Sequence, residues 1–271
     1  MTTVRIIGPG RAGLSFAKAL TSVGVEVQGV LGRSDDIPAA AEGVDLVLVA
    51  VPDRHVAEVA SAVRPVASTV VAHCAGALGL EALAPHRKTA SLHPLVTLPD
   101  PIVGAGRLCG GGYFAVAGDG LVLELVRSLG GRALSVAPEF RATYHAAACV
   151  ASNHLVALLG QVQRVAAAAG IELEAFLPLA QGALDDVARM GPVAALTGPA
   201  ARGDLDTIEG HRRALDVREL TGYDAGVALA RRLAGARARP REHQALPSSK
   251  TADIGCAEAE GALAVAGSWS L

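Results

Sequence analysis

The spacing of apolar positions divides the chain into two parts with different periodicity. From residue 4 to about residue 136, short runs rich in β-branched residues alternate with stretches of helical length. This alternation predicts a parallel sheet whose two faces are covered by helices. The predicted strands are "VRIIG" (4–8), "VQGVLG" (27–32), "DLVLVAV" (45–51), "TVVAHC" (69–74), "TASLH" (89–93), "YFAVAG" (113–118) and "RALSV" (132–136).

The pattern changes after the last predicted strand. Residues 138–236 show Ala- and Leu-rich helical periodicity with few strand-forming residues. We therefore predict a doubly wound, mostly parallel α/β domain over residues 1–137 and an all-helical domain over residues 138–236. Residues 237–271 lose periodicity and mix Pro, Ser, Gly and charged residues, which predicts a loosely ordered tail. The chain of 271 residues is long enough for two domains.

A glycine-rich segment, "VRIIGPGRAGLSFAKAL", follows the first predicted strand and opens a helix. Gly8, Gly10 and Gly13 have the G-x-G-x-x-G spacing. Gly8 permits the tight turn, Gly10 lets the backbone approach a pyrophosphate, and Gly13 lets the helix pack close to the strand. The segment therefore predicts a Rossmann-like dinucleotide site, and a glycine-rich turn that binds no ligand is the alternative.

The same loop predicts which backbone groups meet the phosphates. The helix N-terminus offers unpaired N–H groups and a partial positive charge. Pro9 has no N–H, so we expect Arg11 and Ala12 to donate instead.

The end of the second predicted strand indicates which dinucleotide binds. An NAD site would carry a carboxylate there for the ribose 2′-hydroxyl, whereas this chain has Arg33 and Ser34, which can hydrogen-bond a 2′-phosphate. NADP(H) is therefore the predicted cofactor. Asp35 and Asp36 follow closely and argue against it, unless they cap a turn. A solvated Arg33 is the alternative.

Two further strand ends are expected to face the cofactor. Val51 and Pro52 end the third predicted strand, and His73 ends the fourth. Asp53 is more simply explained as a helix N-cap than as a ligand. His73 precedes Cys74, but no second pair lies at zinc-ligand spacing, so we expect no metal.

Hydride transfer to a carbonyl or imine also needs a group that polarises or protonates the acceptor. His93 lies at the carboxyl end of the fifth predicted strand, directly before Pro94, and this is a suitable place for a catalytic side chain. A histidine with a structural role in a loop is the alternative.

The predicted helix "RATYHAAACVASNHLVALL" carries polar residues among apolar ones. At 100° per residue, His145, Cys149, Ser152 and Asn153 share one face, whereas His154 points the other way. His145 and Asn153 are about 12 Å apart along the axis at 1.5 Å per residue, so they would contact different parts of a cofactor and substrate. A polar dimer or domain interface is the alternative.

The motifs together resemble a known group of proteins. Bacterial proteins that pair a Rossmann-like oxidoreductase domain with a helical C-terminal domain of unknown function are similar over roughly residues 4–235. These proteins resemble the 6-phosphogluconate dehydrogenase-like superfamily, which includes pyrroline-5-carboxylate reductases and ketopantoate reductases, and some are assigned as alternative ketopantoate reductases. The resemblance rests on "IIGPGRAG", "VLGRS", "VAVPD", "HCAGA", "SLHPLVTLPDP", "TYHAAACVASNHLVALL" and "LTGPAARGDLDTIEGHRRAL".

The resemblance implies roles for residues of the helical domain. Ordinary ketopantoate reductases carry a catalytic lysine followed by asparagines four and eight residues later, where this chain has His145, Cys149 and Asn153. A histidinium can also donate the proton to a nascent alkoxide. The roles predicted from the resemblance are therefore proton donation by His145 and site contacts by Asn153 and Ser152.

A later segment, "LTGPAARGD", lies where those enzymes carry a serine and an acidic residue. Here Thr197, Arg202 and Asp204 are expected to face the substrate. Arg202 is the predicted ligand of a substrate carboxylate, and a structural salt bridge to Asp204 is the alternative.

The resemblance implies NADPH-dependent reduction of a small 2-keto acid, most specifically ketopantoate to pantoate in pantothenate synthesis. A pyrroline-5-carboxylate-type imine reductase and a non-catalytic NADP-binding regulator remain open. A net charge of −2 without a basic stripe argues against a nucleic-acid partner. No signal peptide or membrane segment is recognised, so we expect a cytoplasmic protein with reduced cysteines and no membrane partner. The Ala-rich helices favour a homodimer.

Overall fold

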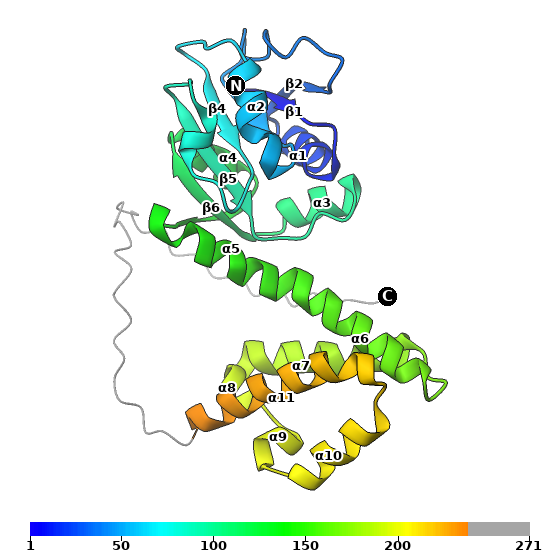
Figure 1. Cartoon of the computed structure of the whole chain (residues 1–271). Helices are drawn as coiled ribbons and strands as arrows, with labels where there is room; N and C mark the ends of the chain where they lie inside the picture. The colour runs from blue at the N-terminus through cyan, green and yellow to red at the C-terminus, as the bar shows by residue number, and fades with distance from the viewer. Residues whose placement is uncertain (238–271) are drawn as a thin grey trace, which may run out of the picture. The chain divides into compact units, whose positions relative to one another are not determined.

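The computed structural model describes residues 1–237, so nearly all of the predicted tail lies outside the described residues. The described residues form two compact units, Met1–Arg164 and a second unit that begins at Val165 (blue to green and yellow-green to orange in Figure 1). None of the helices within residues 1–237 is long and apolar enough to cross a membrane.

All seven predicted strands are present and form one sheet in the order β2-β1-β3-β4-β5-β6-β7. Neighbouring strands are parallel except for β5 and β6, which are antiparallel, so the predicted mostly parallel fold is confirmed. The carboxyl ends of β1, β3, β4 and β5 therefore lie along the same edge. The strands are β1 (Thr3–Ile7), β2 (Glu26–Leu31), β3 (Leu46–Val49), β4 (Val70–His73), β5 (Thr89–Pro94), β6 (Tyr113–Gly118) and β7 (Arg132–Ser135).

The central strands direct alternate side chains into two helical layers. Leu48 packs in a cluster with residues of α1, α3 and α4, and the next residue, Val49, packs with residues of α2 on the other face. This period of two explains why apolar runs such as "LVLV" have both faces buried. The helical segments of the first unit before Pro138 are α1 (Arg11–Ser22), η1 (Asp53–His55), α2 (Val56–Ala62), η2 (Leu80–Leu83), α3 (Pro101–Leu108) and α4 (Leu121–Ser128).

The first helix after the sheet is not the uninterrupted α-helix that the sequence predicts. After the short η3 (Pro138–Phe140), α5 (Arg141–Cys149) continues into a π-helical segment, η4 (Val150–His154), and then into α6 (Leu155–Ala167). Ser152 lies in η4 and its hydroxyl donates to the carbonyl of Ala148, which is the kind of bond that perturbs a helical ladder. The rule of 100° per residue therefore stops applying at Cys149.

The second unit is helical within the described residues, as predicted. Glycines with positive φ, among them Gly170, Gly191 and Gly203, separate its helices. The change of sequence pattern near Pro138 falls within the first compact unit, since that unit extends into α6. The elements are η5 (Leu173–Phe176), α7 (Leu177–Met190), α8 (Pro192–Ala195), α9 (Pro199–Arg202), α10 (Leu205–Ala214) and α11 (Val217–Arg237).

The junction between β1 and α1 has no room for side chains at two of its glycines. A Cβ on Gly13 would lie 2.0 Å from the backbone oxygen of Gly8, and Gly8 itself has a φ of 114°. Gly10 has no atom within 4 Å of its Cβ position. Gly8 and Gly13 are therefore needed for the fold, whereas Gly10 leaves open space beside the loop.

We expect Gly13→Ala to lower the free energy of unfolding by about 2–3 kcal/mol, because the methyl group forces α1 away from β1. Gly10→Ala is the matched control and should change it by less than about 1 kcal/mol. Urea unfolding of both variants measures the difference. Equal stability of the two variants would contradict this account of the loop.

Candidate functional site

The glycine loop at the end of β1 has the form of an anion site. The helical hydrogen bonds of α1 begin with the Leu14 N–H donating to the Gly10 carbonyl, so the N–H groups of Arg11 and Ala12 have no partner within the helix. Pro9, Gly10 and Arg11 are exposed. Open space at Gly10 and free N–H groups at a helix N-terminus fit the phosphates of a dinucleotide.

The carboxylates that follow β2 are engaged in turns. Asp35 accepts a hydrogen bond from the N–H of Gly32 at 2.6 Å, and Asp36 accepts one from the N–H of Ala39 at 3.3 Å. Arg33 and Ser34 are exposed beside them. The arrangement leaves a guanidinium and a hydroxyl accessible at the end of β2, although Asp35 adds negative charge nearby.

The end of β3 leads directly into η1. Val51 lies against the loop, since its Cγ1 is 3.1 Å from the Cβ position of Gly8, and Pro52 is the N-cap of η1. Asp53 is the first residue of η1 and its side chain makes no capping hydrogen bond, so the N-cap predicted at Asp53 is wrong.

His73 is completely buried at the end of β4. Its Nδ1 accepts a hydrogen bond from the N–H of Ala75 at 3.2 Å, which leaves Nε2 to donate to the carbonyl of Gly79 at 3.2 Å. Burial lowers the pKa of His73 and keeps the ring neutral. These contacts favour a structural role in the loop after β4 over the predicted contact with the cofactor.

A pocket of about 210 Å³ lies between the first half of α1 and His93. His93 lies within β5, which continues through Pro94 rather than ending before it. The pocket is lined by Ala12, Phe16, Cys74, His93, Pro94, Val96 and Leu98. The structure thus brings a predicted catalytic residue and a predicted cofactor residue, Ala12, to one cavity.

Helix α5 places two aromatic side chains against His93. The Nδ1 of His93 lies 2.7 Å from the hydroxyl of Tyr144, and the two rings meet edge to face with centroids 5.6 Å apart. The ring of His145 lies 5.8 Å from that of His93. Tyr144 was not predicted, although it immediately precedes His145 in the sequence.

Gly76 allows the two imidazoles to approach each other. A Cβ on Gly76 would lie 2.4 Å from Nδ1 of His145 and 2.8 Å from Nε2 of His93, so both nitrogens border the same small space. The Nδ1 of His145 is buried and has no hydrogen-bond partner among residues 1–237. Such an unsatisfied atom is costly, and it is a common mark of a functional site.

A buried arginine beneath this pair was also missed by the sequence analysis. Arg141 is 5% exposed; its Nη1 donates to the Ser91 hydroxyl and its Nη2 to the Ala75 carbonyl, each at 3.2 Å. Its Nε is buried and has no hydrogen-bond partner in the part of the chain that the structure describes. Only the "R" that opens the predicted helix marks this residue in the sequence, and an opening arginine is usually solvated.

The surroundings of His93, Tyr144 and Cys74 keep these three groups neutral. Burial, followed by the charges of His145, Arg141 and His73, lowers the pKa of His93 to about 4. Burial raises the pKa of Tyr144 to about 12 and that of the Cys74 thiol to about 12. Near neutral pH His93 is therefore an uncharged imidazole beside a protonated phenol.

The remaining predicted residues of this helix have different surroundings. The contact between His145 Nε2 and Cys149 Sγ at 3.6 Å supports the predicted shared face up to that point. Beyond it, the Ser152 hydroxyl oxygen lies 2.7 Å from the Ala148 carbonyl oxygen and 2.8 Å from Asn153 Oδ1, and Asn153 is exposed. Because η4 is π-helical, 100° per residue no longer gives the positions of Ser152 and Asn153 relative to His145, so their alignment with His145 stays a prediction.

Thr197, Arg202 and Asp204 belong to the second compact unit. Asp204 is the N-cap of α10 and accepts hydrogen bonds from the N–H and the hydroxyl of Thr207, which lower the pKa of its carboxyl group. Arg202 is exposed, and its Nη2 lies 4.0 Å from Asp204 Oδ2. The salt bridge that was the alternative to a substrate contact is therefore present, at the upper limit of salt-bridge distance. Thr197 is exposed.

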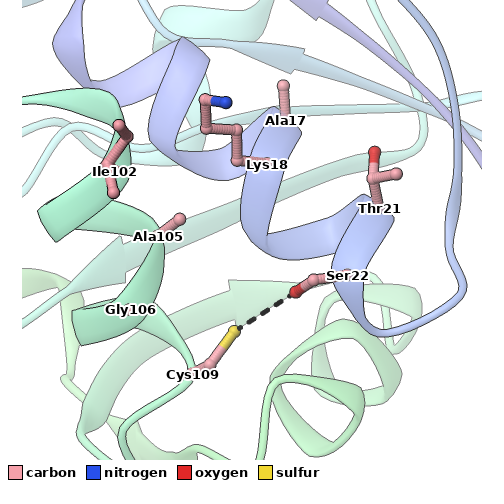
Figure 2. Close-up of a pocket in the computed structure, with 8 residues that line it drawn as sticks. All are labelled: Ala17, Lys18, Thr21, Ser22, Ile102, Ala105, Gly106 and Cys109. Atoms are coloured by element: carbon pink, nitrogen blue, oxygen red, sulfur yellow. Dashed lines mark hydrogen bonds between the residues drawn. The ribbon is translucent and has the colours of Figure 1, made fainter.

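A larger hollow of about 670 Å³ lies between α1 and α3. Figure 2 shows Lys18 and Ser22 of α1 facing Ala105 and Cys109, with the Ser22 hydroxyl 3.9 Å from the Cys109 sulfur. None of the predicted site residues lines it. Among residues 1–237, no three His, Cys, Asp or Glu side chains gather as metal ligands.

Two family profiles match parts of the chain. Residues 34–99 match the family described as "Rossmann-like domain", and residues 116–230 match "Domain of unknown function (DUF2520)". Among curated proteins, the comparison finds no match to this chain. The profiles agree with an α/β part followed by a helical part, and the second begins within β6.

Solved structures of similar fold cover most of the chain. Protein TM1727 from Thermotoga maritima is 27% identical, with a TM-score of 0.65 over 87% of this chain and 100% of its own. BF3122 from Bacteroides fragilis, described as a candidate NADP oxidoreductase, is 19% identical. Its TM-score is 0.72, and the match covers 86% of this chain and 98% of BF3122. Pyrroline carboxylate reductase from Plasmodium falciparum, solved with NADP bound, is 12% identical. Its TM-score is 0.58, and the match covers 86% of this chain and 98% of the reductase. The fold is therefore shared with these proteins.

The low pKa of His93 makes stability depend on pH. The unfolded chain takes up a proton near pH 6.5, whereas folded His93 resists protonation until about pH 4. The contribution to stability is complete above pH 6.5 and is lost as pH falls toward 4, so we expect a loss of roughly 2 kcal/mol between pH 7 and pH 5.

Urea unfolding of the wild type and of His93→Gln at both pH values measures this loss. His93→Gln should lose clearly less stability on acidification than the wild type. The control is His154→Gln, at an exposed histidine of η4, and it should lose as much stability as the wild type. A loss in His93→Gln as large as in the wild type would contradict the assignment.

Proposed function

We propose that this protein is an NADP(H)-dependent reductase of a small molecule with a C=O or C=N bond. The observation that carries the proposal is the 210 Å³ pocket, in which residues of the glycine-loop helix and His93 line one cavity. Hydride acceptors must lie beside both the nicotinamide and a polarising group, and this pocket offers such a place. The likeness to BF3122 and to pyrroline carboxylate reductase supports the cofactor class.

The residues around the pocket have separable roles in the proposed reaction. A bound NADPH would supply the hydride, and the N–H groups at the start of α1 would hold its phosphates. His93 is uncharged and acts as a hydrogen-bond donor that polarises the acceptor. His145, whose Nδ1 borders the same space and lacks a partner, is the proposed proton donor.

Ketopantoate is the substrate that we propose within the 2-keto acid class. The observations that support it are the motifs shared with alternative ketopantoate reductases and the histidine pair, which can protonate an alkoxide. Arg202 is exposed and only weakly engaged by Asp204, which suits a ligand for a substrate carboxylate. Ser152 and Asn153 of the first unit keep their predicted substrate contacts as part of this proposal, and the substrate roles of Thr197, Arg202 and Asp204 in the second unit stay predictions.

An imine substrate is the second candidate. His93 is uncharged at neutral pH, and an imine that arrives protonated demands less from an acid than a ketone does. The fold shared with pyrroline carboxylate reductase points in the same direction.

We also propose that the chain forms a homodimer through its helices. Several apolar side chains of these helices are widely exposed, among them Val156 at 68%, Leu179 at 73% and Leu229 at 68%. A second copy would remove this surface from water.

NADPH oxidation with ketopantoate and with pyrroline-5-carboxylate distinguishes the candidates. We expect turnover with ketopantoate, and His145→Ala should lower kcat by roughly 10²–10⁴-fold while NADPH still binds. Turnover with pyrroline-5-carboxylate alone would favour the imine reductase. Tight NADPH binding without turnover across keto acids and imines would favour a regulator, and unchanged kcat in His145→Ala would remove His145 from the chemistry.

Arg33 tests the choice of cofactor. The 2′-phosphate of NADPH needs a cationic partner, so Arg33→Ala should weaken NADPH binding by about tenfold or more and leave NADH binding nearly unchanged. Fluorescence titration of both nucleotides measures the two constants. Arg54→Ala, at an exposed arginine after β3, is the control. Unchanged NADPH affinity together with equal NADH affinity would contradict the NADP assignment.

A further inference from the structure

We infer that Tyr144 is a positioning residue that donates its hydroxyl hydrogen to Nδ1 of His93 and thereby holds the ring proton of His93 on Nε2. The Nε2 nitrogen borders the space beside Gly76 that it shares with Nδ1 of His145. The role of His93 as a hydrogen-bond donor to the hydride acceptor rests on the proposed reductase function. The position of the ring proton on Nε2 does not depend on that function.

The geometry of the contact supports this direction of donation. The hydroxyl oxygen and Nδ1 are 2.7 Å apart, which is a short distance for a hydrogen bond of this type. Within residues 1–237, the half-buried hydroxyl of Tyr144 has one hydrogen-bond partner, His93. The hydroxyl hydrogen therefore points to that ring or to solvent. Donation to Nδ1 satisfies the phenol and leaves Nε2–H as the remaining ring donor.

The charges around His93 favour an uncharged ring over an imidazolium. The facing groups on α5 are Arg141, Tyr144 and His145, and those at the end of β4 are His73 and Cys74. Arg141 is a buried cation, and the thiol of Cys74 is protonated. Asp53 and Glu81 act on His73 and Arg141, whereas burial, His145, Arg141 and His73 all lower the pKa of His93 and disfavour its imidazolium. With a pKa of about 12, Tyr144 keeps its hydrogen at neutral pH and can donate it.

The fixed tautomer has a chemical consequence. A neutral imidazole with hydrogen on Nε2 can donate a hydrogen bond to a carbonyl oxygen without adding a charge that must be neutralised later. The opposite tautomer would present a lone pair to the acceptor and repel its oxygen. Tyr144 thus decides which of two functions the ring of His93 has.

The chain contains a matched control for this interaction. In the second unit, Nδ1 of His211 lies 2.7 Å from the hydroxyl of Tyr223, with ring centroids 5.8 Å apart, but both residues are outside the pocket. Tyr223→Phe removes the same kind of hydrogen bond as Tyr144→Phe at a residue that does not line the pocket.

The first arm of the test measures the tautomer directly in the ¹⁵N-labelled full-length chain. Long-range ¹H–¹⁵N spectra near pH 7 should show His93 with hydrogen on Nε2, and His93→Gln identifies its signals. In Tyr144→Phe the two ring nitrogens of His93 should shift toward averaged values, whereas Tyr223→Phe should alter only His211. A wild-type His93 protonated on Nδ1, or an unchanged tautomer in Tyr144→Phe, would overturn the inference.

The second arm measures turnover with the acceptor that the wild type reduces. Tyr144→Phe should lower kcat by about tenfold with little change in KM, and should lower it by less than about twofold in the His93→Gln background. An equal loss in both backgrounds would show that Tyr144 acts other than through His93. If the wild type reduces nothing, the proposed function fails, and the spectra of the wild-type chain still decide the tautomer.

Discussion

The buried guanidinium of Arg141 joins three segments that are distant in sequence. It donates to Ser91 in β5 and to the carbonyl of Ala75 after β4, and it opens α5. Removing a charge from water is costly unless its hydrogen bonds are replaced, and here the Ser91 hydroxyl and the Ala75 carbonyl each accept one of them. The contact therefore fixes the start of α5 against the carboxyl edge of the sheet, and Tyr144 and His145 follow one turn later.

The same charge shapes the chemistry of the site. A cation close to His73 and His93 adds to burial in keeping both rings neutral, so the edge of the sheet presents uncharged donors and acceptors rather than imidazolium ions. The two histidines then differ through their hydrogen bonds. Both nitrogens of His73 are used within its own loop, whereas His93 has one nitrogen bound to Tyr144 and the other near the unpartnered nitrogen of His145.

Close backbone approach accounts for the glycines that matter most. Gly13 lets α1 lie against β1, and Gly76 lets the two imidazoles share one space. These positions exclude a side chain for different reasons, since the first contact is with backbone and the second with functional rings. The fold and the site therefore depend on separate glycines, although both lie at the carboxyl edge of the sheet.

The seven strands, the glycine loop and the helical character of the later part could be predicted from the sequence, because they follow from periodicities of two and 3.6 residues and from the needs of a tight turn. It also identified His93 and His145 as candidates. Only the tertiary structure decided that the two rings meet, with Tyr144 and Arg141 beside them, since these contacts join residues 51 and 66 positions apart. The π-helical segment at Ser152 was likewise invisible to a fixed helical period. Local patterns set which elements form, whereas the parallel sheet set which side chains share the site.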